Sequence, residues 1–207
     1  LNPHLIIMSY YAMVTGTNAY SYSAANNCKF GSRLKSYRSD KKSIAAIAVG
    51  PSNYYAVACV GGAAWYCGPS GFKSKMESID CSRIIHISFG YNDQWAITMK
   101  NGWVHASLLP DCLKKVNAHN GDIRYVSLCK HKKDWIVGWG RNGYATGGGL
   151  CSDLTSFLTS CNSSRKEIEL VELGGGDNWF VKHSGGSKWS MNNDLSNWYK
   201  YEQSHSF

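Results

Sequence analysis

Four tryptophans lie beside small and polar residues, in a setting that suits the recognition of a sugar. They are Trp65, Trp103, Trp139 and Trp189. The face of an indole ring packs on the C–H groups of a sugar, and polar groups at nearby turns bind its hydroxyls. We therefore predict carbohydrate-binding roles for these tryptophans and for four turn residues, Asn53, Asp93, Asp134 and Asp177. Packing in the core is the alternative role for any one of the tryptophans.

The residue types that catalysis requires do not gather into a motif. The seven histidines are scattered, and the sequence contains no G-x-S-x-G motif and no P-loop. Asp93, Asp134 and Asp177 recur at equivalent turns, whereas a catalytic carboxylate would interrupt a repeat once. Capping of turns is the alternative role for these aspartates. No catalytic residue is predicted, and the chain is not expected to be an enzyme.

Basic residues dominate the charge, because 22 Lys and Arg residues face 14 Asp and Glu residues and leave a net charge of +8. Six of them cluster early in the chain: Lys29, Arg33, Lys35, Arg38, Lys41 and Lys42. We expect this stretch to be a loop-rich segment that attracts polyanions such as acidic polysaccharide. A solvated loop without a partner is the alternative. Nucleic acid is an unlikely partner, since no recurring Arg pattern or known nucleic-acid module accompanies the patch.

Two uncharged stretches need to be distinguished from membrane spans. Residues 43–72 lack charged side chains, but Gly50, Pro51, Ser52 and Asn53 divide them, and a span needs about 20 continuous apolar residues. Two short strands around a turn are the better interpretation. The chain starts without a basic-then-apolar leader, which suggests that any signal peptide has been removed. Asn162 begins one glycosylation sequon, a minor indication of secretion.

A motif recurs along the chain with nearly constant spacing. Its aromatic anchor occurs at intervals of 44, 40, 40 and 44 residues: Tyr11, Tyr55, Trp95, Trp135 and Trp179. Each anchor is preceded by an apolar run such as I-E-L-V-E-L-G and followed, seven or eight residues later, by Gly or Asn. This pattern predicts three short strands joined by tight turns, and then a looser segment that forms one or two helical turns or an irregular outer strand.

Five such units favour an all-β fold, a five-bladed β-propeller forming a single domain over residues 1–207. The predicted repeats cover residues 4–42, 43–82, 83–121, 122–166 and 167–207. Stacking the units in a ring covers both faces of each small sheet and hides its edges. A β-trefoil would need three repeats, and a linear solenoid would need distinct capping ends.

The pattern G-x-x-D-x-W-F/A-V/I followed by G-G-x-x-W resembles the repeats of short propellers, and the five-fold count is similar to that of tachylectin-2-like five-bladed lectins. The resemblance covers nearly the whole chain in architecture, and it transfers no sugar-site residues of that family. It implies a non-catalytic, secreted, multivalent carbohydrate-binding protein, since repeated weak sites add by avidity. An extracellular structural or protein-interaction propeller, bound to matrix or surface proteins through its basic and aromatic surface, is the alternative.

The eight cysteines form an even set without zinc-type spacing, so no metal or other cofactor is predicted. Disulfides in an oxidising compartment are favoured, and buried thiols of a cytosolic protein are the alternative. The repeat register suggests bridges within units for Cys67–Cys81 and Cys151–Cys161, each pair flanking a looser segment. It also suggests bridges between units for Cys28–Cys59 and Cys112–Cys129.

Overall fold

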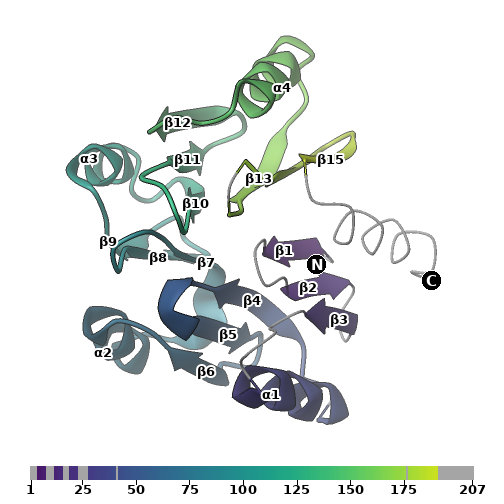
Figure 1. The fold of residues 1–207 in the computed structure, drawn as a ribbon, viewed down its shortest axis with the longest axis vertical. Helices are drawn as coiled ribbons and strands as arrows, with labels where there is room; N and C mark the ends of the chain where they lie inside the picture. The colour runs from purple at the N-terminus through teal and green to yellow at the C-terminus, as the bar shows by residue number, and fades with distance from the viewer. Residues whose placement is uncertain are drawn as a thin grey trace.

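The computed structural model describes residues 4–7, 12–15, 19–22, 28–40, 42–175 and 177–190, and these residues form five sheets of three antiparallel strands each (Figure 1). The sheets are β1 (His4–Ile7), β2 (Ala12–Thr15) and β3 (Ala19–Tyr22); β4 (Ile44–Val49), β5 (Tyr55–Cys59) and β6 (Ala64–Cys67); β7 (Ile84–Phe89), β8 (Trp95–Met99) and β9 (Val104–Ser107); β10 (Ile123–Leu128), β11 (Trp135–Trp139) and β12 (Gly143–Gly147); and β13 (Ile168–Leu173), β14 (Trp179–His183) and β15 (Gly186–Ser190).

A helix follows each of the first four sheets: α1 (Cys28–Ser39), α2 (Ser70–Ser78), α3 (Pro110–Ala118) and α4 (Ser152–Ser163). Two short 3₁₀ turns, η1 (Pro51–Asn53) and η2 (Cys81–Arg83), complete the described elements. β4, β7, β10 and β13 each begin one residue after a predicted repeat boundary. Within the described ranges, no helix is long and apolar enough to cross a membrane.

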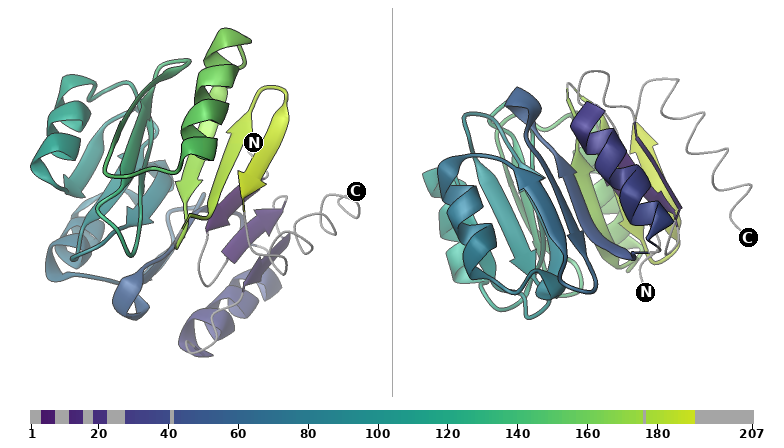
Figure 2. Two further views of the ribbon diagram at one scale, coloured as in Figure 1. Left: turned by 45° about the horizontal axis from the view of Figure 1, so that its top comes forward. Right: turned by 90° about the horizontal axis from the view of Figure 1, so that it is seen from below.

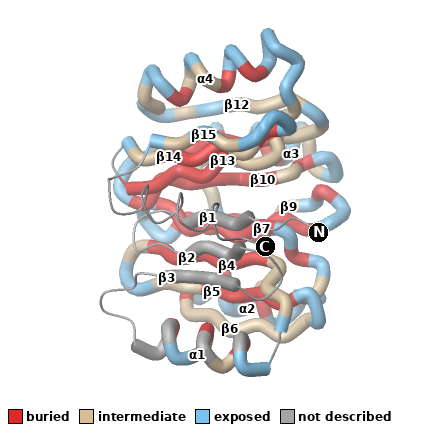
Figure 3. The backbone as a smooth tube through the Cα atoms, turned by 90° about the vertical axis from the view of Figure 1, so that its right-hand side faces the viewer, coloured by how far each residue is buried: buried red, intermediate tan, exposed pale blue. Residues whose placement is uncertain are grey.

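The first strands of the five sheets lie next to one another in chain order. β1 lies beside β4, β4 beside β7, β7 beside β10 and β10 beside β13, and β1 also lies beside β13. Figures 1 and 2 show the same arrangement, with the first strands towards the middle and the helices outside. Each first strand therefore has neighbours on two sides, and Figure 3 shows β7, β10 and β13 as largely buried.

The aromatic anchors occupy equivalent positions in four sheets. Each is the first residue of a middle strand and pairs with the last residue of the strand before it, in the register Tyr55↔Val49, Trp95↔Phe89, Trp135↔Leu128 and Trp179↔Leu173. The three tryptophans are buried, whereas Tyr55 is half-buried. The predicted repeat alignment is confirmed for these four anchors. Tyr11, the fifth anchor, lies outside the described residues.

The looser segments are helices of nine or twelve residues, not an irregular outer strand. The all-β prediction therefore needs correction, because the fold is mostly β with a helix after each of the first four sheets. Each helix buries at least two residues four positions apart, as an amphipathic helix does. The first residues of these pairs are Phe30, Phe72, Cys112 and Leu154. The second residues, four positions later, are Leu34, Met76, Val116 and Leu158. The basic stretch at residues 28–42 is likewise mostly helix α1 and was wrongly predicted to be loop-rich.

Aromatic contacts attach each of three helices to the sheet that follows it in the chain. The ring of Phe30 in α1 lies 5.6 Å from that of Tyr55, Phe72 in α2 lies 5.7 Å from Trp95, and Phe157 in α4 lies 6.0 Å from Trp179. The anchor row thus receives the helix of the preceding unit. This packing joins neighbouring units through their cores.

The structure does not contain the predicted disulfides. All seven cysteines whose side chains are described are free thiols, while the side chain of Cys28 lies outside the described residues. Cys151 immediately precedes α4 and Cys161 is in its last turns, so the rise of the helix separates them by about 15 Å. Cys67 and Cys81, at the end of β6 and in η2, are likewise free thiols. A disulfide needs Cα atoms within about 7 Å, which excludes Cys151–Cys161, and neither within-unit bridge is present in the structure. The between-unit bridges Cys112–Cys129 and Cys28–Cys59 are also absent, because Cys112, Cys129 and Cys59 are free thiols.

Candidate functional site

A cavity with a volume of about 640 Å³ is lined by four successive sheets. The beginnings of β4, β7, β10 and β13 contribute to its wall, together with the turn between β8 and β9. Because the first strands lie side by side in chain order, a cavity that touches four of them lies at one end of the space that they enclose. We call it the axial cavity.

A repeated bulge aims side chains into this cavity. In each of the four sheets, the pairing of the first two strands skips the second residue of the first strand: Ala45, Ile85, Arg124 and Glu169. All four line the axial cavity. A bulge bends the strand and redirects one side chain, and the same distortion here presents a different residue type from each sheet.

Two basic and two acidic side chains line the cavity, Lys100 and Arg124 with Asp122 and Glu169, and ion pairs hold Arg124 and Glu169. Arg124 Nη1 donates to Glu167 Oε1 and to the carbonyl oxygen of Gly140, the latter at 3.3 Å. Lys182 Nζ lies 2.8 Å from Glu169 Oε2. The guanidinium keeps further N–H donors, and each carboxylate keeps acceptor capacity. The wall therefore offers hydrogen-bonding groups without a strong net charge.

Trp103 stands at the edge of the axial cavity and is the most exposed of the large hydrophobic side chains described, at 53%. A Cβ added to Gly121, which lines the cavity, would lie 3.8 Å from the indole nitrogen of Trp103. Asn101, another lining residue, accepts a hydrogen bond from the Trp103 backbone N–H at 3.4 Å. Val60 and Ile85 add exposed apolar surface in the cavity, at 42% and 36%.

A buried polar network lies at the inner end of the cavity. His86 lines the cavity, and its Nε2 is 2.5 Å from Glu172 Oε1. Ser127 Oγ donates to Glu172 Oε2 at 3.1 Å and accepts from the Leu173 backbone N–H at 2.8 Å. Burial lowers the pKa of neighbouring Lys130 to about 8, although the charge of Glu172 opposes the change. The carboxylate of Glu172 thus connects β13 with β7 and β10.

The other predicted tryptophans are placed differently from Trp103. Trp65 stacks on Tyr55 at 4.2 Å, and Trp139 stacks on His119 at 3.7 Å. Trp189 is half-buried on β15, where it pairs with Phe180. The four side chains therefore do not form a repeated exposed row, and only Trp103 adjoins the axial cavity.

The predicted turn residues lie at the opposite ends of the sheets, in the turns that follow each first strand. Asn53 and Asp93 have positive φ values of 60° and 59°, a conformation in which Asn and Asp are favoured among non-glycine residues. Asp93 accepts a hydrogen bond from the Tyr54 hydroxyl at 2.8 Å, and Asp134 accepts from the Gly149 N–H at 2.7 Å. Asp177 is paired with Lys132 at 2.7 Å. Structural roles in turns and between units account for these contacts.

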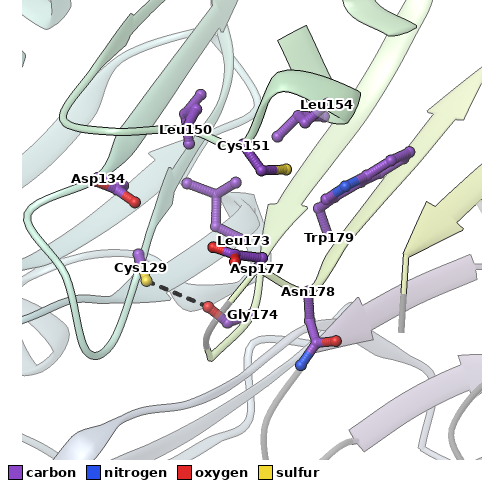
Figure 4. A pocket seen from close by; sticks show the side chains of 10 residues that line it. All are labelled: Cys129, Asp134, Leu150, Cys151, Leu154, Leu173, Gly174, Asp177, Asn178 and Trp179. Carbon is purple, nitrogen blue, oxygen red and sulfur yellow. Dashed lines mark hydrogen bonds between the residues drawn. The ribbon is translucent and has the colours of Figure 1, made fainter. Parts of the chain in front are cut away.

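A second, small cavity of about 10 Å³ lies between β10–β12 and β13–β15 (Figure 4). Cys129 and Cys151 both line it, and Cys129 Sγ donates to the Gly174 carbonyl oxygen at 3.3 Å. Its volume is close to that of a single water site, too small for an organic ligand. No group of three or more His, Cys, Asp or Glu side chains in the described ranges could hold a metal ion.

Most of the remaining predicted residues belong to helices α1 and α4. Lys29, Arg33, Lys35 and Arg38 belong to α1, and their side chains lie outside the described residues. Lys42, beyond the helix, is exposed and lies 3.9 Å from Asp40; Lys41 is outside the described residues. Asn162 is exposed near the end of α4, where an attached glycan would meet solvent.

Sequence reasoning missed Arg124, Glu169, His86 and Glu172. A usable signal was present, since each is an ionisable residue inside an otherwise apolar strand run. Such residues are rarely buried without partners.

Compared with known proteins, the chain matches no protein-family model and no curated sequence. The site therefore has to be interpreted from its own geometry.

Proposed function

We propose that the chain is a five-bladed β-propeller of the tachylectin-2-like architecture, and that it binds carbohydrate without catalysis at its axial cavity. The observation that carries the proposal is the axial cavity itself. A volume of about 640 Å³ lies within the range of small-molecule sites, and it accommodates one or two sugar rings.

The chemistry of the wall favours a neutral polyhydroxyl ligand. The indole of Trp103 supplies a flat apolar surface for the C–H face of a sugar, and Asn101, Asp122, Arg124 and Glu169 supply hydrogen-bonding groups. Ion pairs to Glu167 and Lys182 compensate the charges of Arg124 and Glu169. A polyanion would find little net positive potential in this cavity.

The proposal differs from the multivalent lectin expected from sequence, because the predicted tryptophans do not repeat as equivalent exposed residues. One axial site per chain is the form that the described residues support. An extracellular location remains part of the proposal and depends on the exposed sequon at Asn162, since the described cysteines are free thiols.

Helix α1 favours a second function, the binding of an acidic polysaccharide or an acidic surface protein. Four basic residues belong to this one helix, Lys29, Arg33, Lys35 and Arg38. Binding through such a patch depends strongly on ionic strength, which separates it from sugar binding at the axial cavity.

A glycan array read at low and at high salt tests the proposal. We expect retention of a neutral glycan that salt does not remove and that the free sugar displaces. Trp103→Ala should abolish this signal, whereas Tyr91→Ala should not. Tyr91 is also exposed, at 43%, but it lies in the turn at the opposite end of β7. Salt-sensitive binding to every polyanion, with no neutral glycan retained, would favour the α1 patch instead.

A further inference from the structure

The wall of the axial cavity is divided by polarity. At the four bulges that line it, the neighbouring strands β4 and β7 present apolar side chains, Ala45 and Ile85, whereas β10 and β13 present charged ones, Arg124 and Glu169. The sheet β4–β6 contributes only apolar lining residues, among them Val60. The repeated bulge thus builds an apolar part and a charged part of one cavity.

Val60 and Ile85 expose their side chains in the apolar part, at 42% and 36%. Five large hydrophobic side chains of the described residues are exposed, and these are the two that line the cavity. Val60 lies in the turn between β5 and β6, where a Cβ added to Gly62 would lie 3.7 Å from the Cβ of Ser82, just before β7. The two side chains therefore belong to adjoining segments. We call Ala45, Val60 and Ile85 the apolar wall.

The apolar wall does not suit a second sugar ring. Branched aliphatic side chains have neither a flat ring face nor a hydrogen-bonding group, so sugar hydroxyls placed on them would lose water without gaining a partner. An alkyl or aryl group gains from the same surface, at about fourfold in affinity for each methylene removed from water.

The polar part of the same cavity remains available for the sugar. Trp103 adjoins Gly121 at the start of the unit that carries Arg124, so the indole and the hydrogen-bonding groups lie away from the apolar wall along the row of sheets. The volume of about 640 Å³ leaves room for a second group beside one sugar ring. Because four sheets contribute to the cavity, a group that reaches the apolar wall must be small enough to enter it.

We infer that the apolar wall holds a short alkyl or aryl aglycone, so that the ligand of the axial cavity is a glycoside rather than a free sugar or a longer oligosaccharide. The sugar contacts the charged part, and the aglycone covers Val60 and Ile85. The inference deepens the proposed function and rests on it for the sugar.

The first test compares matched glycosides that differ only in the length of the aglycone. Titration calorimetry of the full chain with the methyl and hexyl glycosides of glucose, galactose and mannose gives the affinities. The hexyl glycoside of the recognised sugar should bind at least tenfold more tightly than the methyl glycoside. It should also shift the side-chain methyl resonances of Val60 and Ile85 in ¹³C NMR. Equal affinities for the two glycosides would overturn the inference.

The second test is the double variant Val60→Thr with Ile85→Thr. Both changes keep the β-branched shape and place a hydroxyl on an exposed surface, so the melting temperature should change little. The preference for the hexyl glycoside should fall below twofold. Leu113→Gln is the control, because Leu113 is also exposed, at 38%, but lies on α3 and does not line the cavity. A double variant that folds and keeps the full preference would show that the wall is not the aglycone site.

1-Hexanol, which carries the apolar group without a sugar, separates the inference from the proposed function. If hexanol shifts the methyl resonances of Val60 and Ile85 and no glycoside binds, the apolar wall stands as a binding site and the sugar proposal fails. If the methyl and hexyl glycosides bind equally well, carbohydrate binding stands and the aglycone site is wrong. Methyl resonances that respond to none of these probes overturn the inference. Shifts that follow protein concentration without any probe, together with a dimer in sedimentation, also overturn it, because a second copy then covers the wall.

Discussion

Glu172 on β13 links three sheets, because its buried carboxylate receives hydrogen bonds from His86 on β7 and Ser127 on β10. Taking a carboxylate out of water is costly, and the cost is offset only where partners are well placed. The arrangement makes the contact between the first strands specific as well as apolar. If His86 or Ser127 is removed, the buried Glu172 carboxylate loses one of these hydrogen bonds.

Replacing His86 by Ala should therefore lower the free energy of unfolding by about 3–5 kcal/mol, since it leaves the Glu172 carboxylate buried without its closest partner. Urea denaturation measures the change. Asp40→Ala, which breaks an exposed pair with Lys42 at 3.9 Å, should cost less than about 1 kcal/mol. A His86→Ala loss as small as that of the control would show that the pair is not needed for stability.

Lys130 should make stability depend on pH. Burial lowers its pKa in the folded protein to about 8, against about 10.4 in an unfolded chain. Between these values the unfolded chain binds more protons, so the free energy of unfolding should rise with pH from about 8 to about 10.4. Below pH 8 the lysine is charged in both states and its full desolvation penalty remains.

The predicted gain is about 3 kcal/mol across that window, measured as wild type minus Lys130→Met in denaturation series at several pH values. The subtraction matters because burial raises the pKa of other groups, including Cys112 to about 12. Such groups lower stability as the pH rises, and they do so in both proteins. A difference that stays constant with pH would contradict the assignment to Lys130.

At the scale of elements, turns connect neighbouring units as well as neighbouring strands. The Gly102 carbonyl oxygen accepts from the N–H groups of Gly121 and Ile123, at 3.0 and 3.2 Å. Gly102 has a φ of 76°, and an added Cβ would lie 2.5 Å from the Gly121 carbonyl carbon. The turn between β8 and β9 therefore fits against the start of β10 only if this residue has no side chain.

Gly102→Ala should cost about 2 kcal/mol or more in unfolding free energy, from left-handed strain and from the backbone clash. Thermal unfolding compared with Gly61→Ala provides the test. Gly61 lies in the corresponding turn between β5 and β6, and an added Cβ there meets nothing within 4 Å. The Gly61 variant should be neutral or slightly more stable, because alanine restricts the unfolded chain. Equal losses would mean that the contact to Gly121 is unimportant.

At the scale of the whole molecule, β1 is the element that joins the two ends of the described chain, since it lies beside both β4 and β13. The other sheets contact neighbours close to them in the sequence. The contact between β1 and β13 joins residues 4–7 to residues 168–173, and it completes the row of neighbouring first strands.

Deleting residues 1–10 should lower the melting temperature sharply, because the loss of β1 exposes edges of β2, β4 and β13 that had been covered. Differential scanning calorimetry of the truncated and full chains measures the effect. An unchanged melting temperature would show that the N-terminal strand does not contribute to the circle.

The sequence alone determined the number of units, the three strands in each and the position of the anchors Tyr55, Trp95, Trp135 and Trp179. These features follow from alternation, turn residues and spacing, which are local properties. The sequence also contained the helical spacing of the looser segments, but their length was underestimated. That error carried into the cysteines, because Cys151 and Cys161 are close in sequence and lie near opposite ends of a helix.

Only the tertiary structure decided which residues share a site. Arg124, Glu169 and His86 lie in three units of the repeat, and the circle of first strands brings them to one cavity. It also separates Trp103 from Asp93, which lie at opposite ends of β8 although only nine residues stand between them in the sequence. Repetition of a local pattern fixes each sheet, whereas the grouping of side chains depends on how sheets distant in sequence pack together.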